Sequence, residues 1–494
     1  MILAPGRSTS IRCLLLAALA FVPLYASGAT AQDGARPHPR LAAADGRVIV
    51  LGWDGADSTT TERMIAEGQL PNLERLAEQG TFAPLTSTHP AESAAGWAAL
   101  NTGLNPAKNG IPSFFGRNII DEQPFAYPFH FRTEDVAIED FEHTGLMNIL
   151  VRTDPIVLTS GTLVGVFLIF FVVFAGLLKV KKEIALVLAV ALGGAGAWGA
   201  ITASGYVPTS VPGVYKNNIE QDGFWAVAAN AGVSTMVLDA ALAFDRPTIE
   251  GARVLAGLGL PDARSEVGEW FIYTTDALEI GKEPKGSDTN SSSGTVFRVQ
   301  DLGGKISSNV YGPVNFWEKD VLQRRIDEIE EKRQDLDLSW EENNGLLDEQ
   351  DGLKAQAAEY SLSSNKYDSH RTKVPLTIEK GLDGGKARVT ISSQSQELAE
   401  GEWSDWYRLE FVINPLIKVH AVTRVKIMKM DDDFSLLINT LDIDPSNPPF
   451  WQPISQPHDF SADLSSWIRE RRSTAQSVKA GDLATTPVNA DGVI

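Results

Sequence analysis

The longest apolar runs of the chain lie one after the other in its first half. The run Ile156–Leu178 carries no charge, and a helix of its length, at about 1.5 Å per residue, crosses the roughly 30 Å hydrocarbon layer of a membrane. A second run, Ile184–Ala203, follows a turn with three lysines, Lys179–Lys182, and its glycines and alanines allow close helix contact. The pattern predicts a transmembrane hairpin over residues 155–204, with the lysine turn in the cytoplasm. The alternative is a buried helix pair in a soluble core.

The N-terminus has the features of an export signal. Arg7 and Arg12 precede a short apolar stretch, Cys13–Ala26, and the small residues of Ala29–Ala31 form a cleavage site. We therefore predict a signal peptide over residues 1–31, and an uncleaved N-terminal anchor is the alternative. An exported chain whose lysine turn is cytoplasmic has both soluble parts on the extracytoplasmic (periplasmic) side of the membrane.

Outside the membrane segment, short β-branched runs alternate with helix-like stretches. Strands are expected at Arg47–Leu51, Thr81–Leu85 and Val233–Leu238. Helices are expected at Thr59–Ala66, Pro71–Gln79, Ser93–Leu100 and Phe224–Asn230. Alternation of this kind predicts an α/β fold with a mostly parallel sheet flanked by helices.

Two later segments differ from this alternation. Trp317–Ala358 places apolar residues at helical spacing among many charges, with Asn343–Gly345 as a natural turn, and predicts an inserted charged helical hairpin. We interpret it as a solvated structural arm rather than as a recognition site. After Val374, alternating runs predict strands at Ala387–Ile391, Arg408–Ile413 and His420–Met430.

These elements divide the chain into seven segments. They are the signal peptide (1–31), the first part of an α/β domain (32–154), the transmembrane hairpin (155–204), the continuation of the α/β domain (205–315), the helical insertion (316–361), a β-rich continuation (362–464) and a divergent tail (465–494). A chain of 494 residues is long enough for about three domains.

Charge and cysteine content exclude several classes of function. The 43 Lys and Arg residues are outnumbered by 63 Asp and Glu residues, which gives a net charge of −20. The resulting field repels phosphate, so we expect no nucleic-acid polymer as a partner, and a bound phosphate ester needs local positive charge such as a metal. Cys13 is the only cysteine, which excludes a disulfide framework, a cysteine-ligated zinc site and a cysteine nucleophile.

Two residues of the first part of the α/β domain are candidates for chemistry. Asp54 follows the predicted strand Arg47–Leu51, where open sheets hold their ligands, and a carboxylate there is a common metal ligand. A simple turn residue before glycine is the alternative. Ser93 begins a predicted helix, whose dipole stabilises developing negative charge and suits a hydroxyl that attacks a phosphate. A helix N-cap is the alternative for Ser93.

The same residues carry a family resemblance. The segment Val48–Asp57 (VIVLGWDGAD) resembles the opening strand of the alkaline phosphatase superfamily, in its branch of type I phosphodiesterase/nucleotide pyrophosphatase-like proteins. Leu70–Leu76 (LPNLERL) is similar to a helix of that branch. Four stretches resemble the nucleophile segment of that branch: Pro90–Ser93, Trp97, Thr102–Pro106 and Gly110–Ile111. Further stretches similar to the family are Gly257–Arg264, Trp270–Asp276 and Glu402–Trp406. The resemblance covers about residues 47–118 and 214–465.

The resemblance implies an alkaline phosphatase-like fold and a site with two divalent metal ions, usually zinc. Asp54 would be a ligand of one metal, and Ser93 would bridge to that metal as the nucleophile that forms a covalent phosphoserine. The substrate would be a phosphate mono- or diester, and members of the superfamily are often homodimers. The sulfatase branch is disfavoured, because the residues after Ser93 lack the proline and arginine of the sulfatase motif.

The family's remaining metal ligands come late in the chain, as an Asp-x-x-x-His motif, an Asp-His pair and a further histidine. The histidines after Ser93 match neither spacing; they are His130, His143, His370, His420 and His458. Asn109 stands where the family often has histidine. The resemblance fades near Asp463, so we interpret the chain as the N-terminal portion of the enzyme, ended by a truncation, a split gene or a frameshift. The missing ligands would then come from a C-terminal polypeptide that completes the site or from sequence lost to error.

Two hypotheses follow. The first is a metal-dependent phosphoric ester hydrolase, of phosphodiesterase or phosphatase type, at the outer face of the membrane. The second is a truncated, non-catalytic remnant or binding protein of the same family, anchored in the membrane. Both hypotheses have the lipid bilayer as a partner.

Overall fold

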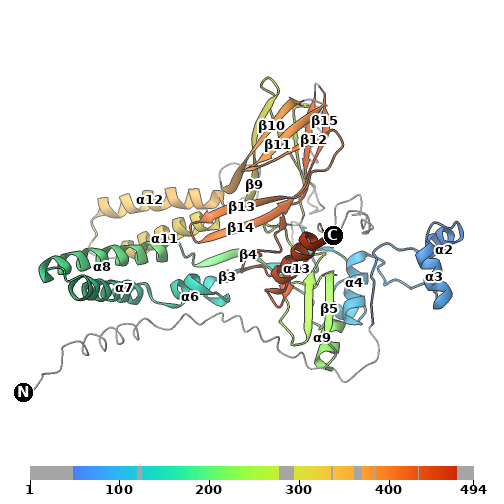
Figure 1. Cartoon of the computed structure of the whole chain (residues 1–494), viewed down its shortest axis with the longest axis horizontal. Coiled ribbons are helices and arrows are strands. Elements are labelled where there is room, and N and C mark those ends of the chain that lie inside the picture. Colours follow the sequence, from blue (N-terminus) through green and yellow to red (C-terminus); the bar gives the residue numbers. More distant parts are fainter. Residues whose placement is uncertain are drawn as a thin grey trace, which may run out of the picture. The chain divides into compact units, whose positions relative to one another are not determined.

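A computed structural model of the protein describes residues 48–118, 125–266, 268–276, 294–334, 338–360, 370–382, 385–431 and 433–475 (Figure 1). The predicted signal peptide lies outside the described residues, as does the predicted tail from residue 476 onward. The described residues divide into two compact units, one formed by Ile138–Thr209 and the other by the described residues of 48–137 and 210–475. We call them the hairpin unit and the α/β unit.

The described part of the hairpin unit is helical. Its elements are η1 (Ile138–Asp140), α6 (Gly145–Arg152), α7 (Pro155–Phe171), the π-helical turn η2 (Val172–Leu177) and α8 (Lys182–Gly205). Two segments, Pro155–Leu177 and Lys182–Gly205, are long and apolar enough to cross a membrane, with mean hydropathies of 2.6 and 2.1. They coincide with the two runs of the predicted hairpin, and their length and composition indicate membrane association.

Helices α7 and α8 lie side by side through small residues of α8 (Figure 1). Ala185 and Ala189 are fully buried. A Cβ atom on Gly193 would lie 3.0 Å from the carbonyl oxygen of Leu163, and one on Gly196 would lie 3.2 Å from a side-chain atom of α7. The small residues therefore allow the two backbones to approach closely, as the glycines and alanines of the second run predict.

The α/β unit opens with helices that local sequence signals define. They are α2 (Ser58–Ala66), α3 (Pro71–Gln79), α4 (Ser93–Thr102) and α5 (Pro106–Asn109). Pro71 occupies the first turn of α3, where the missing N–H costs nothing. Gly103 ends α4 in the left-handed conformation, with φ of 69°. The helices predicted in this part of the chain are confirmed.

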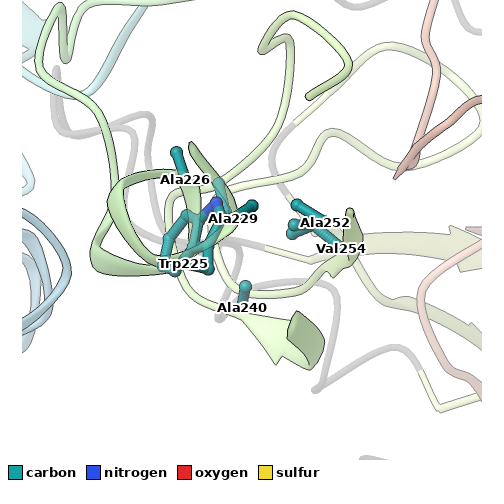
Figure 2. Packing of buried hydrophobic residues seen from close by; sticks show 7 residues of the cluster. Trp225, Ala226, Ala229, Ala240, Ala252 and Val254 are labelled. Carbon is teal, nitrogen blue, oxygen red and sulfur yellow. The ribbon is translucent and has the colours of Figure 1, made fainter. Parts of the chain in front are cut away.

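Helix α9 packs on a pair of parallel strands. The elements are α9 (Phe224–Asn230), β5 (Thr235–Ala240), β6 (Ala252–Ala256) and β18 (Ser455–Gln456), with strand order β18-β6-β5. The core between helix and strands joins Trp225 and two alanines of α9 to Ala240, Ala252 and Val254 (Figure 2). The small side chains let α9 lie close to the strands. The predicted helix and strand of this region are confirmed.

The other described strands form small sheets. The two-stranded ones pair β1 (Phe115–Asn118) with β2 (Phe125–Pro128) and β3 (Phe131–Ala137) with β4 (Ser210–Asn217). A four-stranded sheet has the order β12 (Gln394–Ala399), β11 (Lys386–Ile391), β10 (Arg371–Leu382), β9 (Lys305–Val314). A second has the order β15 (Val425–Met430), β16 (Phe434–Ile438), β7 (Phe271–Thr274), β8 (Thr295–Arg298). A three-stranded sheet has the order β13 (Tyr407–Asn414), β14 (Ile417–Thr423), β17 (Asp442–Ile443). The predicted strands after Val374 are confirmed, with His420–Met430 divided between β14 and β15.

The helical insertion consists of α11 (Phe316–Arg333) and α12 (Trp340–Glu359), and α13 (Phe460–Ala475) follows near the C-terminus. The predicted segment forms two helices, but the predicted turn is wrong, because Asn343–Gly345 lies inside α12. A capping box starts α12: Ser339 Oγ accepts the N–H of Glu342, and the Glu342 carboxylate accepts the N–H of Ser339. This start signal outweighs the turn tendency of Asn-Asn-Gly, so the connection precedes Ser339.

Two of the predicted strands do not form among the described residues. From Val48 onward, Arg47–Leu51 is irregular and exposed, Val48 to 92% and Leu51 to 72%. Thr81–Leu85 is irregular as well. A β-branched run becomes a strand where a neighbouring strand accepts its hydrogen bonds, and no strand in the described ranges pairs with either segment.

The described sheets fit an α/β fold in part. The pairs β5–β6 and β7–β8 are parallel, and the other described strand pairs are antiparallel. Helices and partly parallel sheets therefore occur in one chain, as the sequence predicts. A mostly parallel sheet is not confirmed.

Candidate functional site

Helix α4 presents Ser93 as its first residue. The N-cap position before it is Glu92, whose side chain makes no capping hydrogen bond. Oγ of Ser93 donates a hydrogen bond to Oδ1 of Asp54 at 3.1 Å, across 39 residues of sequence. The structure therefore brings together the two residues that the sequence singles out, and Ser93 does not act as the helix cap.

Asp54 lies in a turn directly before α2. Gly55 has φ of 68°, a left-handed conformation that glycine adopts without strain. Asp57 caps α2, because its carboxylate accepts the N–H of Thr60 at 2.7 Å, and this hydrogen bond lowers the pKa of Asp57. The Asp57 carboxylate therefore serves as the cap of α2, and Asp54 is the carboxylate of this turn that contacts Ser93.

The ring of Trp97 contacts the segment that leads to Asp54. Trp97 lies one helical turn after Ser93, and a Cβ atom on Gly52 would lie 2.6 Å from Cη2 of its ring. The ring is partly buried and packs on a cluster that includes Ala98 of α4. One aromatic side chain thus contacts both the core beneath α4 and the backbone two residues before Asp54.

Helix α4 itself packs at the carboxyl end of β5. Ala94 and Ala98 are fully buried in a cluster with Ala241 and Leu242, which directly follow β5. Asn101 donates a hydrogen bond from Nδ2 to the carbonyl oxygen of Ala241 at 2.6 Å. Open α/β sheets bind ligands at the carboxyl ends of their strands, so the first turn of α4 lies at such a position.

Two other polar residues of this part of the chain support local structure. Glu92 accepts a hydrogen bond from the hydroxyl of Ser113 at 2.5 Å. Asn109 is 3% exposed, donates from Nδ2 to the carbonyl oxygen of Leu104 at 3.0 Å and accepts the N–H of Ile111 at 2.9 Å. Asn109 therefore holds the loops on either side of α5.

The five histidines after Ser93 lie in separate surroundings. His130 is 3% exposed and packs edge-on against the rings of Phe114 and Phe131. Burial lowers the pKa of His130 to about 4, so its ring is neutral at pH 7. The others are His143 in the hairpin unit, His370 before β10, His420 on β14 and His458 before α13.

Asp54 and Ser93 together offer two oxygen donors to a cation. Within the described ranges, no group of three or more His, Cys, Asp or Glu side chains is placed to hold a metal ion. A catalytic zinc ion has three protein ligands, and a two-metal centre needs more. The described residues therefore do not form a complete two-metal site.

Comparison with known proteins covers the segment that holds both Asp54 and Ser93. The family model of type I phosphodiesterase / nucleotide pyrophosphatase matches residues 48–237. This segment is similar to the type I phosphodiesterase / nucleotide pyrophosphatase family. The match confirms the family predicted from the motifs, and it supports a phosphoester hydrolase kind of function. No curated protein and no solved structure matches the chain.

The phosphodiesterase segment, residues 48–237, runs from just before Asp54 to the first half of β5. It includes α4 and both candidate membrane helices. The similar stretches at Gly257–Arg264, Trp270–Asp276 and Glu402–Trp406 lie beyond the match, so their resemblance stays a prediction.

The contact between Gly52 and Trp97 could not be predicted from the sequence. The sequence shows Trp97 as part of a motif, and it shows Gly52 as the residue that ends a β-branched run. A glycine at such a position often marks the close approach of another group. Spacing alone does not say which ring approaches it.

Proposed function

We propose that the protein is a membrane-anchored phosphoric ester hydrolase in which Ser93 is the nucleophile and Asp54 its partner. The 3.1 Å hydrogen bond between their side chains carries the proposal. It joins two motifs 39 residues apart, and both motifs lie inside the phosphodiesterase segment. A serine and an aspartate with only local structural roles are not expected to form a hydrogen bond with each other across this distance in the sequence.

The two side chains suit an attack on phosphorus. Oγ of Ser93 forms the new bond to phosphorus while the bond to the leaving oxygen breaks, which gives a phosphoserine. Asp54 accepts the hydrogen bond of the hydroxyl and can take its proton, which then passes to the leaving oxygen. The first N–H groups of a helix lack partners within it, so those of α4 can stabilise the phosphate oxygens. Water then hydrolyses the phosphoserine.

A cation is needed to hold a phosphate ester at this position. Asp54 and Glu92 are both carboxylates near Ser93, and the chain's net charge of −20 adds to the repulsion. The family resemblance implies two divalent ions, usually zinc, to which Asp54 and Ser93 would contribute donors. We propose that the other donors come from outside the described residues, with a C-terminal polypeptide as the source that we favour.

Hydrolysis of an aryl phosphate tests the proposal. The full-length protein in detergent, supplied with zinc, is assayed on an aryl monoester and an aryl diester. Ser93→Ala should abolish hydrolysis, and Asp54→Asn should slow it by about 10²-fold or more. Ser87→Ala, at an exposed serine of the preceding loop, is the matched control and should retain the wild-type rate. Hydrolysis that survives Ser93→Ala would contradict the proposal.

A non-catalytic role is the second candidate, and the incomplete donor set favours it. Two oxygen donors hold zinc weakly, because each missing ligand lowers the affinity of the site. Wild-type protein that neither binds zinc in a calorimetric titration nor hydrolyses either ester would support a membrane-anchored binding protein. Zinc binding that Asp54→Asn removes would support the hydrolase.

We also propose that α7 and α8 cross the membrane as a hairpin, with Lys179–Lys182 in the cytoplasm and both soluble parts on the periplasmic side. The three lysines of the turn support this orientation. In spheroplasts that express a Cys13→Ser chain, Lys181→Cys should be protected from a membrane-impermeant maleimide. Leu85→Cys, at a residue that is 91% exposed, should react. The opposite labelling pattern would contradict this orientation.

The proposed export signal has a separate test. Cleavage after Ala31 gives a mature chain that starts at Gln32. N-terminal sequencing of the membrane-bound protein should therefore begin at Gln32, and a chain that begins at Met1 would show an uncleaved anchor.

A further inference from the structure

We propose that Trp97 is a positioning residue, whose ring holds Gly52 and thereby sets Asp54 against Ser93. The inference concerns the placement of Asp54, and it rests on the proposed function only for its effect on catalysis. Trp97 would act through the backbone that leads to Asp54, because its ring lies against Gly52, two residues before Asp54.

Asp54 needs an external support, because its own segment has few contacts. Val48, Leu51 and Trp53 are exposed to 92%, 72% and 62%. No strand in the described part of the chain pairs with this segment. The hydrogen bond between Asp54 and Ser93 is exposed, and such a bond exchanges readily with water. It therefore does not hold the segment in place by itself.

The ring of Trp97 supplies that support from a fixed position. Its inner side packs on the cluster around Ala94, Ala98 and Leu242, all of them buried. Its outer edge meets Gly52 so closely that a Cβ atom there would lie 2.6 Å from Cη2 and 2.9 Å from Cζ3. Real Cβ atoms do not approach a carbon this closely, so the contact requires a glycine.

The Asp54–Ser93 and Gly52–Trp97 contacts match in spacing along the two segments that they join. Ser93 and Trp97 are four residues apart on one face of α4, which is about 6 Å along a helix. Asp54 and Gly52 are two residues apart, which is at most about 6.6 Å along the chain. Asp54 therefore meets Ser93 where Gly52 meets Trp97, and a shift at the second contact is transmitted to the first.

Disulfide formation measures the placement of Asp54 without reference to activity. In the full-length chain with Cys13→Ser, the pair Asp54→Cys and Ser93→Cys provides the only two thiols. Because the native side chains approach to 3.1 Å, the pair should oxidise readily under a mild thiol-disulfide buffer. Adding Gly52→Ala or Trp97→Ala should slow oxidation by about tenfold. Gly96→Ala is the matched control, because a Cβ atom on this α4 glycine meets nothing within 4 Å, and it should leave the rate unchanged.

A compensating pair separates positioning from general damage to the core. Trp97→Phe keeps an aromatic ring in the cluster but shortens its reach toward Gly52. Combined with Gly52→Ala, the shorter ring leaves room for the new methyl group, so the double variant should oxidise faster than Gly52→Ala alone. Oxidation rates that none of these changes alters would overturn the proposal. Effects that simply add in the double variant would overturn it as well.

The aryl phosphate assay then connects placement to catalysis. If the wild type hydrolyses the ester, Gly52→Ala should lower kcat by about tenfold, and Trp97→Phe should restore part of the loss. A kcat that Gly52→Ala leaves unchanged would overturn the positioning role. If the wild type hydrolyses nothing, the proposed function fails, and the disulfide rates still decide whether Trp97 places Asp54.

Discussion

The Arg264→Met substitution should destabilise the α/β unit strongly, because it removes the positive charge at the centre of a buried ion network. The Arg264 side chain is 0% exposed and donates from Nε to Asp262 at 3.0 Å. Its Nη2 lies 3.0 Å from a carboxylate oxygen of Glu266 and 2.8 Å from one of Glu269. The guanidinium also lies 4.5 Å from the centroid of the Phe271 ring.

The magnitude follows from what the substitution leaves behind. Asp262 is 1% exposed, so without Arg264 its carboxylate is buried without its ion-pair partner, while Glu266 still pairs with Arg371. Removing one partner of a buried ion pair costs about 3–5 kcal/mol in the free energy of unfolding. Methionine fills part of the vacated volume, so the loss reflects charge more than packing. A loss of this size is a large fraction of the stability of a typical domain.

Urea unfolding of the full-length protein in detergent, followed by tryptophan fluorescence, measures the effect. Arg388→Met is the matched control, since Arg388 pairs with Glu397 at 2.7 Å but is 42% exposed. An exposed pair contributes about 0–1 kcal/mol, so its midpoint should shift little. Adding Asp262→Asn to Arg264→Met should recover part of the loss, because the unpaired charge is then removed. Equal shifts for Arg264→Met and Arg388→Met would show that the buried charge of Asp262 is not what destabilises the variant.

Three further predictions concern pH and helix packing. Burial raises the pKa of Asp262 from 3.8 to about 6, so stability is lost as the pH rises through this range. The free energy of unfolding of Asp262→Asn should therefore rise relative to that of the wild type between pH 4 and pH 7 in urea unfolding. Burial lowers the pKa of His130 from 6.5 to about 4, so its contribution to stability is present above pH 6.5 and is lost on acidification. The free energy of unfolding of His130→Phe should therefore rise relative to that of the wild type as the pH falls. A difference between the two proteins that does not change with pH would contradict this. Gly193→Val should cost about 1–3 kcal/mol of hairpin stability, measured by thermal unfolding in detergent, because a side chain there meets Leu163. Gly194→Val, where a Cβ atom meets nothing within 4 Å, should have a smaller effect.

Local signals predicted the helices well. Pro71 in the first turn of α3 and Gly103 at the end of α4 are signals that lie within a few residues of the element they bound. The two membrane helices could be predicted for a similar reason, since length and apolar composition are properties of one segment. Asn343–Gly345 shows the limit of such signals, because two of them competed and the capping box at Ser339 prevailed.

Contacts between distant segments could not be predicted in the same way. The run Val48–Leu51 has strand-forming residues, but no described strand lies beside it, and β propensity depends on such neighbours. For the site, family motifs picked out Asp54 and Ser93, and the structure added their 3.1 Å contact. The closeness of Gly52 and Trp97 is a property of the folded chain, and no spacing in the sequence encodes it.

The most direct test of Ser93 as the nucleophile is to look for phosphate on this residue during turnover. The full-length protein is incubated with zinc and an aryl phosphate, and the reaction is quenched in acid. The protein is then digested, and the mass of the peptide that contains Ser93 is measured by mass spectrometry. We predict a phosphorylated peptide in the wild type and in Ser87→Ala, and none in Ser93→Ala. Turnover of the ester with no phosphate on Ser93 would contradict the account.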